Sequence, residues 1–83
     1  MDQKYYVYVL RSLKTDRRYT GSTNNLDKRL FQHNNGQSKY TRKTGPYELI
    51  YSESYPTQLE ARRRERYLKT GKGREELDQL LNL

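Results

Sequence analysis

The run from Tyr5 to Leu10, YYVYVL, constrains the fold more than any other stretch of the chain. Every residue in it is aromatic, β-branched or leucine, and such a run predicts a β-strand that is buried on both faces. Side chains alternate along a strand, so Tyr8 is expected to point to one face while Val7 and Val9 point to the other. A strand of this kind needs packing partners on both sides, which favours a sheet lying between helices.

Polar and turn-forming residues divide the rest of the chain into further elements. A cluster of helix N-capping residues, Ser22 to Asn25, precedes a stretch with helical periodicity, and Gly71 and Gly73 are expected to break the chain. The predicted elements are strands over residues 5–10, 18–21 and 47–54 and helices over residues 26–34, 57–69 and 74–82. This order predicts an α/β fold: one domain, residues 1–83, with a small three-stranded antiparallel or mixed sheet flanked by helices.

The composition favours a polyanionic partner. Lys and Arg number 17 against 10 acidic residues, a net charge of +7 on 83 residues, and such a surface favours nucleic acid over an acidic protein or a membrane surface. The absence of Cys excludes disulfides, thiolate metal sites and cysteine nucleophiles. The N-terminus resembles no signal peptide, and no apolar run approaches the ~20 residues needed to span a bilayer. We therefore expect a soluble, cytoplasmic monomer.

Glu65 stands out among the candidate chemical groups. It lies in a run of arginines, yet helical spacing places it on the same side as Ala61 and Leu68. That side is expected to face the sheet, and half-burying a carboxylate costs free energy unless it is paired or binds a cation. Two interpretations follow: Glu65 binds a metal ion, or it forms a salt bridge with Arg29 or another basic residue.

Arg29 and His33 lie one helical turn apart on the first predicted helix. Together they could reach a phosphate beside the sheet. The alternative for Arg29 is an ordinary surface cation, and the alternative for His33 is a histidine at the edge of the core, hydrogen-bonded to backbone. Because His33 is the only histidine and the chain lacks cysteine, a structural zinc site is excluded.

Two strand motifs resemble those of the GIY-YIG nuclease family. The first reads YVY over residues 6–8, and the second, Tyr-Ile-Gly in the family, reads YTG over residues 19–21. Tyr6 stands where the family has glycine, and Thr20 stands where it has isoleucine. Both departures are mild, because the tyrosine hydroxyls and the glycine are the functional parts of these motifs.

Two helix motifs follow in the family's order. Arg29 lies on the first helix with His33 one turn later, and residues 61–69 match the pattern Ala-x-x-x-Glu-x-x-Leu-Lys, with Glu65 at the motif position. The resemblance covers about residues 4–72. The chain is similar to the N-terminal nuclease domain of the excinuclease C protein, without that protein's other domains.

The resemblance implies a metal-dependent endonuclease that hydrolyses phosphodiester bonds in nucleic acid, with DNA expected rather than RNA. Glu65 would be the sole protein ligand of one divalent cation, Mg²⁺ or Mn²⁺, and Arg29 would hold a phosphate oxygen. Tyr19 would act as general base on the attacking water. His33 is the rival base, since a tyrosine needs help to lose its proton near neutral pH. Tyr8 would orient the water or the phosphate.

A basic surface beside this site would follow the nucleic-acid backbone, and Gly21 would let the backbone pass close to the substrate. The predicted members of the binding surface are Gly21, Lys39, Tyr40, Arg42, Lys43, Arg62, Arg63 and Arg66. A late polar residue of longer family members has no match here, and Leu77 lies near its position. The alternatives are therefore a domain that binds nucleic acid without efficient turnover, and a structural or protein-interaction domain.

Overall fold

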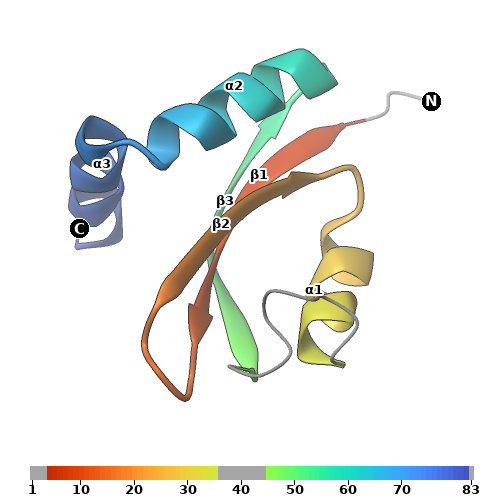
Figure 1. The fold of residues 1–83 in the computed structure, drawn as a ribbon. Helices are drawn as coiled ribbons and strands as arrows, with labels where there is room; N and C mark the ends of the chain where they lie inside the picture. The colour runs from red at the N-terminus through yellow and green to blue at the C-terminus, as the bar shows by residue number, and fades with distance from the viewer. Residues whose placement is uncertain (1–3, 36–44, 83) are drawn as a thin grey trace.

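The computed structural model describes residues 4–35 and 45–82, which form one three-stranded sheet and three helices. The strands are β1 (Tyr5–Ser12), β2 (Arg18–Thr23) and β3 (Tyr47–Tyr55). Their order is β2-β1-β3, and both pairs are antiparallel, so β1 is central and the other two form the edges (Figure 1). The sheet is thus antiparallel rather than mixed, and the α/β architecture is confirmed.

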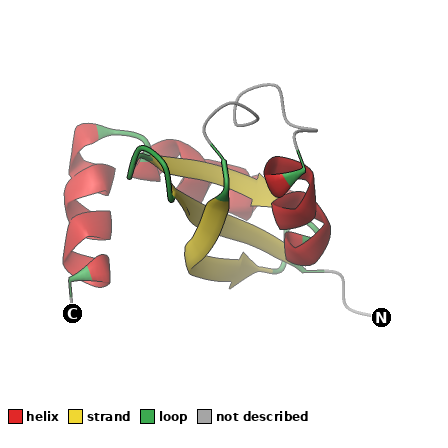
Figure 2. Ribbon diagram, turned by 90° about the horizontal axis from the view of Figure 1, so that it is seen from below, coloured by secondary structure: helices red, strands yellow, loops and turns green. Residues whose placement is uncertain are grey.

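The helices cover both faces of the sheet, as the doubly buried first strand predicted. They are α1 (Leu26–Asn34), α2 (Gln58–Leu68) and α3 (Gly71–Leu81). Figure 2 shows α1 and α3 at opposite ends of the sheet, and in Figure 1 α2 lies above the sheet, next to the end of β3. In the described part of the chain, none of these helices has the length and apolar character needed to cross a membrane.

The core consists of two small clusters, one on each face. The cluster under α1 is formed by Tyr8, Leu10 and Tyr47, with Tyr19, Leu26 and Leu30 packed against it. The cluster under α2 and α3 is formed by Val7, Val9, Ala61, Leu68 and Leu77. The alternation of Tyr8 with Val7 and Val9 therefore divides the two clusters as the sequence predicted.

Side-chain caps fix the position of α1. The side chain of Asn25 accepts a hydrogen bond from the backbone N–H of Lys28 and starts the helix. At the other end, Asn34 bonds twice to the backbone of Tyr47: its amide donates to the carbonyl at 3.1 Å, and its carbonyl accepts from the N–H at 2.6 Å. The helix is therefore attached directly to the start of β3.

The predicted break at Gly71 and Gly73 is wrong, because both residues lie inside α3. Thr70 caps this helix by accepting from the N–H of Gly73. A Cβ on Gly73 would lie 1.9 Å from the carbonyl oxygen of Tyr67 and 2.6 Å from Cα of Leu68. Glycine is needed here for close packing of α3 on the end of α2, so it marks a helix contact instead of a loop.

Candidate active site

A hydrogen-bonded group surrounds the hydroxyl of Tyr8, on the side of the sheet that α1 covers. The hydroxyl lies 3.1 Å from Nε2 of His33 and accepts a hydrogen bond from Nε–H of Arg29 at 3.3 Å. Both partners come from α1, one turn apart. Three of the predicted site residues therefore meet at one oxygen atom.

Gly21 makes room for this hydroxyl. It lies directly opposite Tyr8 in the antiparallel pair of β1 and β2. A Cβ at this position would lie 2.5 Å from the Tyr8 hydroxyl oxygen and 2.8 Å from its ring carbon Cζ. Any other residue would push the Tyr8 ring out of place, so Gly21 has a role inside the site, whatever its contact with a substrate.

Tyr19 lies beside the same group. It is opposite Leu10 in the sheet, which places it on the α1 side. Its ring centroid is 5.0 Å from that of His33 and 6.4 Å from that of Tyr8. Tyr19 is half-buried, whereas Tyr8 and His33 are only 2% and 1% exposed, so Tyr19 is the one of these three rings that solvent reaches.

The electrostatics of the group follow from its burial. Burial raises the pKa of Tyr8, and the hydrogen bond from Arg29 opposes this only in part. Burial also lowers the pKa of His33, and the charge of Arg29 lowers it further. Both groups are therefore neutral near pH 7. The Tyr8 hydroxyl then shares one hydrogen bond with Nε2 of His33 while its oxygen accepts another from Arg29.

Glu65 approaches from the other side of the sheet, on α2. Its Oε1 accepts from the hydroxyl of Ser22 at 2.6 Å, and its Oε2 accepts from Nζ of Lys69 at 2.7 Å. Burial raises the pKa of Glu65, but the hydrogen bonds from Lys69 and Ser22 and the charges of Lys69 and Arg62 outweigh it and leave the pKa below its usual value. The carboxylate is ionised, and its ion-pair partner is Lys69, not Arg29.

The two halves of the site meet at strand β2. Ser22 pairs with Val7 and points to the α2 side, while Gly21 pairs with Tyr8 and faces the α1 side. Glu65 is close enough for its charge to contribute to the raised pKa of Tyr8. The predicted residues are therefore brought together around one edge strand, with the carboxylate on one face and the tyrosines and Arg29 on the other.

The predicted basic surface is divided by the helical phase of α2. Arg62 lines a hollow of about 220 Å³ together with Ser22 and Thr23, on the side of Glu65. Arg63 is 200° around the helix from the buried Ala61 and lies on the outer side. Arg66 is exposed between these two directions. Residues 39–43, which include Lys39, Tyr40, Arg42 and Lys43, fall outside the described residues.

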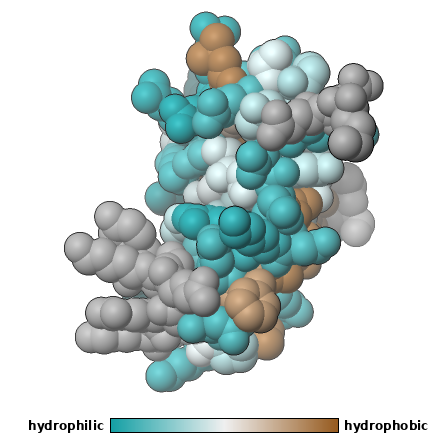
Figure 3. Space-filling view, turned by 90° about the vertical axis from the view of Figure 1, so that its right-hand side faces the viewer, coloured by the Kyte–Doolittle hydropathy of each residue, from teal (hydrophilic) through white to brown (hydrophobic). Residues whose placement is uncertain are grey.

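A second hollow, of about 230 Å³, lies on the α1 side. It is lined by Ser22, Thr23, Asn24, Asn25, Lys28, Arg29 and Gln32. Figure 3 shows a mostly hydrophilic surface on the side of the molecule where α1 lies, with only small hydrophobic areas. Polar hydrogen-bonding groups and one further cation, Lys28, thus surround the accessible part of Arg29, which suits a phosphate better than an apolar ligand.

The carboxylate of Glu65 fits a single hard cation. It is ionised and half-buried, and its oxygen atoms are the type of ligand that Mg²⁺ and Mn²⁺ prefer. Within residues 4–35 and 45–82, no group of three or more His, Cys, Asp or Glu side chains could hold a metal ion. Water and substrate oxygen atoms would therefore have to supply the remaining ligands. Lys69, which bonds to Oε2, would have to move if a cation used that oxygen.

The fold and these residues can be compared with known proteins. A family model described as the GIY-YIG catalytic domain matches residues 4–78. The chain belongs to the GIY-YIG family. This confirms the resemblance of the strand and helix motifs.

Relatives of this GIY-YIG protein are small proteins. It is 51% identical over 65 residues to a UPF0213 protein of Clostridium perfringens, a match that covers 77% of this chain and 69% of that protein. The chain is also 43% identical over 70 residues to a UPF0213 protein of Oceanobacillus iheyensis, a match that covers 83% of this chain and 80% of that protein. The solution NMR structure of a UPF0213 protein from Bacillus halodurans matches with a TM-score of 0.56 at 36% identity. This match covers 93% of this chain and 84% of that chain.

Membership of this family indicates a general function. GIY-YIG domains are nuclease domains, which act on nucleic acid and generally use a divalent metal ion.

Two residues of the site, Ser22 and Lys69, were not identified from the sequence. Lys69 lies four residues after Glu65, which is the spacing of a helical ion pair. Ser22 follows Gly21 directly, so strand alternation could have placed it on the α2 side.

Proposed function

We propose that the protein is a metal-dependent endonuclease that hydrolyses phosphodiester bonds, in DNA rather than RNA. The observation that carries this proposal is the arrangement at β2. Arg29 and neutral His33 hold the hydroxyl of Tyr8 on one face, and the ionised Glu65 lies across the strand on the other. Because β2 is an edge strand, the guanidinium group of Arg29 and the carboxylate of Glu65 can both approach a phosphate that lies along its free edge.

Tyr19 is the better candidate for the general base. A base must reach the attacking water, and Tyr19 is half-buried while His33 is 1% exposed and bonded to Tyr8. In this proposal Tyr19 reacts as the phenolate, after its own hydroxyl proton has passed to solvent. Its oxygen then takes one proton from the attacking water, which leaves neutral Tyr19 and a hydroxide nucleophile. His33 acts as a positioning residue, because it holds the hydroxyl of Tyr8 in place for the water or the phosphate.

Arg29 would bind a non-bridging phosphate oxygen. Its Nε donates to Tyr8 and its Nη1 donates to Gln32 at 3.2 Å, which fixes the plane of the guanidinium group. The rest of the planar fork can then meet a phosphate in one orientation. Glu65 would hold one Mg²⁺ or Mn²⁺ ion, which stabilises charge on the leaving oxygen when bound. Ser22 orients the carboxylate for this role.

A second candidate function is nucleic-acid binding without efficient turnover. It is favoured by Leu77, which lies near the position of a late polar residue of longer family members and is 2% exposed in the core under α3. Leu77 cannot contribute to a metal site. The basic surface and the Arg29 clamp would serve binding equally well.

The test is cleavage of supercoiled plasmid and branched DNA with Mg²⁺ or Mn²⁺. We expect Glu65→Gln and Arg29→Ala each to reduce the rate by about 10²- to 10³-fold, the size of effect seen when one transition-state contact is removed. The matched controls are Glu75→Gln and Lys14→Ala, which remove the same charges from exposed positions outside the described site.

The results separate the two functions. Cleavage that is lost in the two site variants and kept in the two controls would support the endonuclease. Equal residual cleavage in all variants would indicate a contaminating nuclease and contradict it. If the wild-type protein binds DNA but does not cut it with either ion, binding is the function that remains.

A further inference from the structure

A third hollow lies on the other side of Tyr19 from Arg29. It measures about 590 Å³ and is formed between the start of β2 and the junction of α2 and α3. Its lining residues are Arg17, Arg18, Tyr19, Thr20, Leu68, Lys69, Arg74 and Leu77. Half of them are cations and none is acidic. None of the four cations belongs to the binding surface that the sequence predicted.

The cations of this hollow are not equally neutralised. Arg18 forms an ion pair with Asp78, and Lys69 forms one with Glu65. Arg17 and Arg74 are exposed, and neither has an ion-pair partner among the residues that the structure describes. Two unneutralised cations over one concave surface favour an anion.

The hollow borders two residues of the candidate active site. Tyr19 lines it and also contacts the ring of His33 at 5.0 Å. Lys69 lines it and bonds to Glu65 at 2.7 Å. A ligand in the hollow would therefore border Tyr19 and Lys69 on the α2–α3 side of the sheet, whereas the Arg29 guanidinium lies on the α1 side.

We propose that this hollow is a second phosphate site, which binds a neighbouring phosphate of the strand that the enzyme cuts. Arg17 and Arg74 bind the phosphate, and the Arg18–Asp78 ion pair holds the wall between β2 and α3. This proposal rests on the proposed function for the identity of the ligand. Two phosphates held on either side of Tyr19 would fix the position of the strand, and the binding itself needs no turnover.

The first experiment measures binding by wild-type protein and an Arg17→Ala/Arg74→Ala variant. The probe is a fluorescent 12-nucleotide single-stranded DNA, with EDTA present so that no cleavage occurs. We expect the variant to lose roughly tenfold in affinity at 50 mM salt and its salt slope to fall by about 0.7, the value for one single-strand phosphate. The control, Lys14→Ala/Lys72→Ala, removes the same net charge from exposed positions that do not line the hollow.

The second experiment identifies the phosphate. Single linkages of the DNA are replaced in turn by neutral methylphosphonates. In the wild type, we expect binding to weaken when one linkage next to the most strongly bound linkage of the DNA is replaced. The same replacement should have no further effect in Arg17→Ala/Arg74→Ala. The Arg29→Ala variant should instead lose its sensitivity at a different linkage.

Three outcomes would overturn the proposal: an equal loss of affinity in the control variant, the absence of any linkage whose effect depends on Arg17 and Arg74, or a lack of DNA binding by the wild type at low salt. Failure of the proposed function is seen separately, as a lack of metal-dependent plasmid cleavage. A protein that binds with the expected linkage pattern but does not cut would retain the second phosphate site and lose the endonuclease.

Discussion

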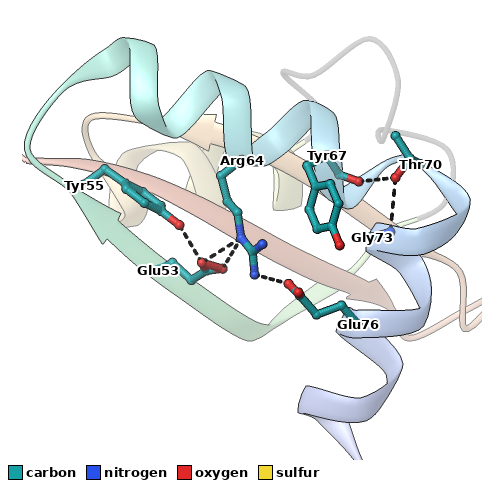
Figure 4. A network of polar contacts seen from close by, with 7 residues as sticks. All are labelled: Glu53, Tyr55, Arg64, Tyr67, Thr70, Gly73 and Glu76. Carbon is teal, nitrogen blue, oxygen red and sulfur yellow. Dashed lines mark hydrogen bonds and ion pairs between the residues drawn. The ribbon is translucent and has the colours of Figure 1, made fainter.

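Two groups of polar side chains pack against the sheet, and they satisfy their charges in different ways. One is the ion network of Glu53, Arg64 and Glu76, which joins β3, α2 and α3 (Figure 4). The other is the group around Tyr8 and Glu65 at β2. In the network, every charge meets an opposite charge inside the protein. At β2, the partners of Arg29 among residues 4–35 and 45–82 are neutral, and part of its guanidinium group remains available to a ligand.

The ion network is held from several directions. Nε of Arg64 donates to both oxygens of Glu53, at 3.0 and 3.1 Å, and Tyr55 donates to Glu53 at 2.7 Å. Burial and the contact with Glu53 raise the pKa of Tyr55 to about 12, so this hydroxyl stays a donor. The guanidinium also lies 5.4 Å from the ring centroid of Tyr67. Such an arrangement fixes the position of α2, and with it that of Glu65.

The comparison teaches that residue type alone does not separate structural from functional arginines. Arg62, Arg63, Arg64 and Arg66 occupy one short run, yet a rotation of 100° per residue sends each in a different direction. Arg64 points to β3 and is 23% exposed, while Arg62 points to β2 and Arg63 to solvent. Three experiments test whether the two groups are separate in function.

The largest effect on stability is expected from Arg64→Met. This change leaves Glu53, at 17% exposure, and Glu76 facing each other without a cation. Removal of one member of a buried ion pair is strongly destabilising, and with the partial exposure seen here we expect about 2–3 kcal/mol. Urea denaturation followed by circular dichroism would measure it, with Arg63→Met as the control.

The DNA cleavage rate per folded molecule should stay within a few-fold of wild type in Arg64→Met. A loss as large as that expected for Arg29→Ala, at a temperature where the variant is folded, would show that the ion network takes part in the reaction. The separation of the two groups would then be wrong.

The sequence predicted more of the fold than of the site, because the fold depends on local patterns. The run at Tyr5–Leu10 fixed the central strand, and capping residues placed the helices within a few positions. The contacts that make the site join distant segments: Gly21 opposite Tyr8, and Ser22 beneath Glu65. No local pattern gives that register. Gly73 was misjudged for the same reason, since its packing partner is another helix.

Gly21→Ala should give a smaller loss of stability and a clear loss of cleavage. The new methyl group would overlap the Tyr8 hydroxyl, 2.5 Å away, and the ring must shift. Overpacking of this kind costs about 1–2 kcal/mol. The informative control is Gly21→Ala with Tyr8→Phe. Removal of the hydroxyl relieves the closest contact and should restore part of the stability, measured by urea denaturation, without restoring cleavage.

If the double variant recovers cleavage, the Tyr8 hydroxyl has no role in the reaction and the overlap alone explains the loss. If Gly21→Ala is as stable and active as wild type, the close packing of Gly21 against Tyr8 does not determine the site. Either result would mean that the group at β2 tolerates substitution better than the ion network does, which is the reverse of what we expect.

The smallest effect concerns the pH dependence of stability, and it arises from His33. Burial and Arg29 lower the pKa of His33 from its ordinary value of 6.5, so the folded protein binds a proton less readily than the unfolded chain. Stability from this group is therefore fully present above pH 6.5 and is lost as pH falls through the folded-state pKa. Glu65, whose lowered pKa starts from 4.5, loses its contribution only at lower pH. Urea denaturation between pH 7.5 and 5 thus isolates the histidine.

His33→Asn should flatten this dependence, because His33 is the only histidine in the chain. The same experiment on Arg64→Met should leave the slope intact, since this change leaves His33 and the contacts with Tyr8 and Arg29 in place. A slope that persists in His33→Asn would mean that another group takes up a proton on unfolding. A slope that disappears in Arg64→Met as well would mean that the two polar groups are coupled, and that the packing of α2 controls the neutral state of the Tyr8–His33 pair.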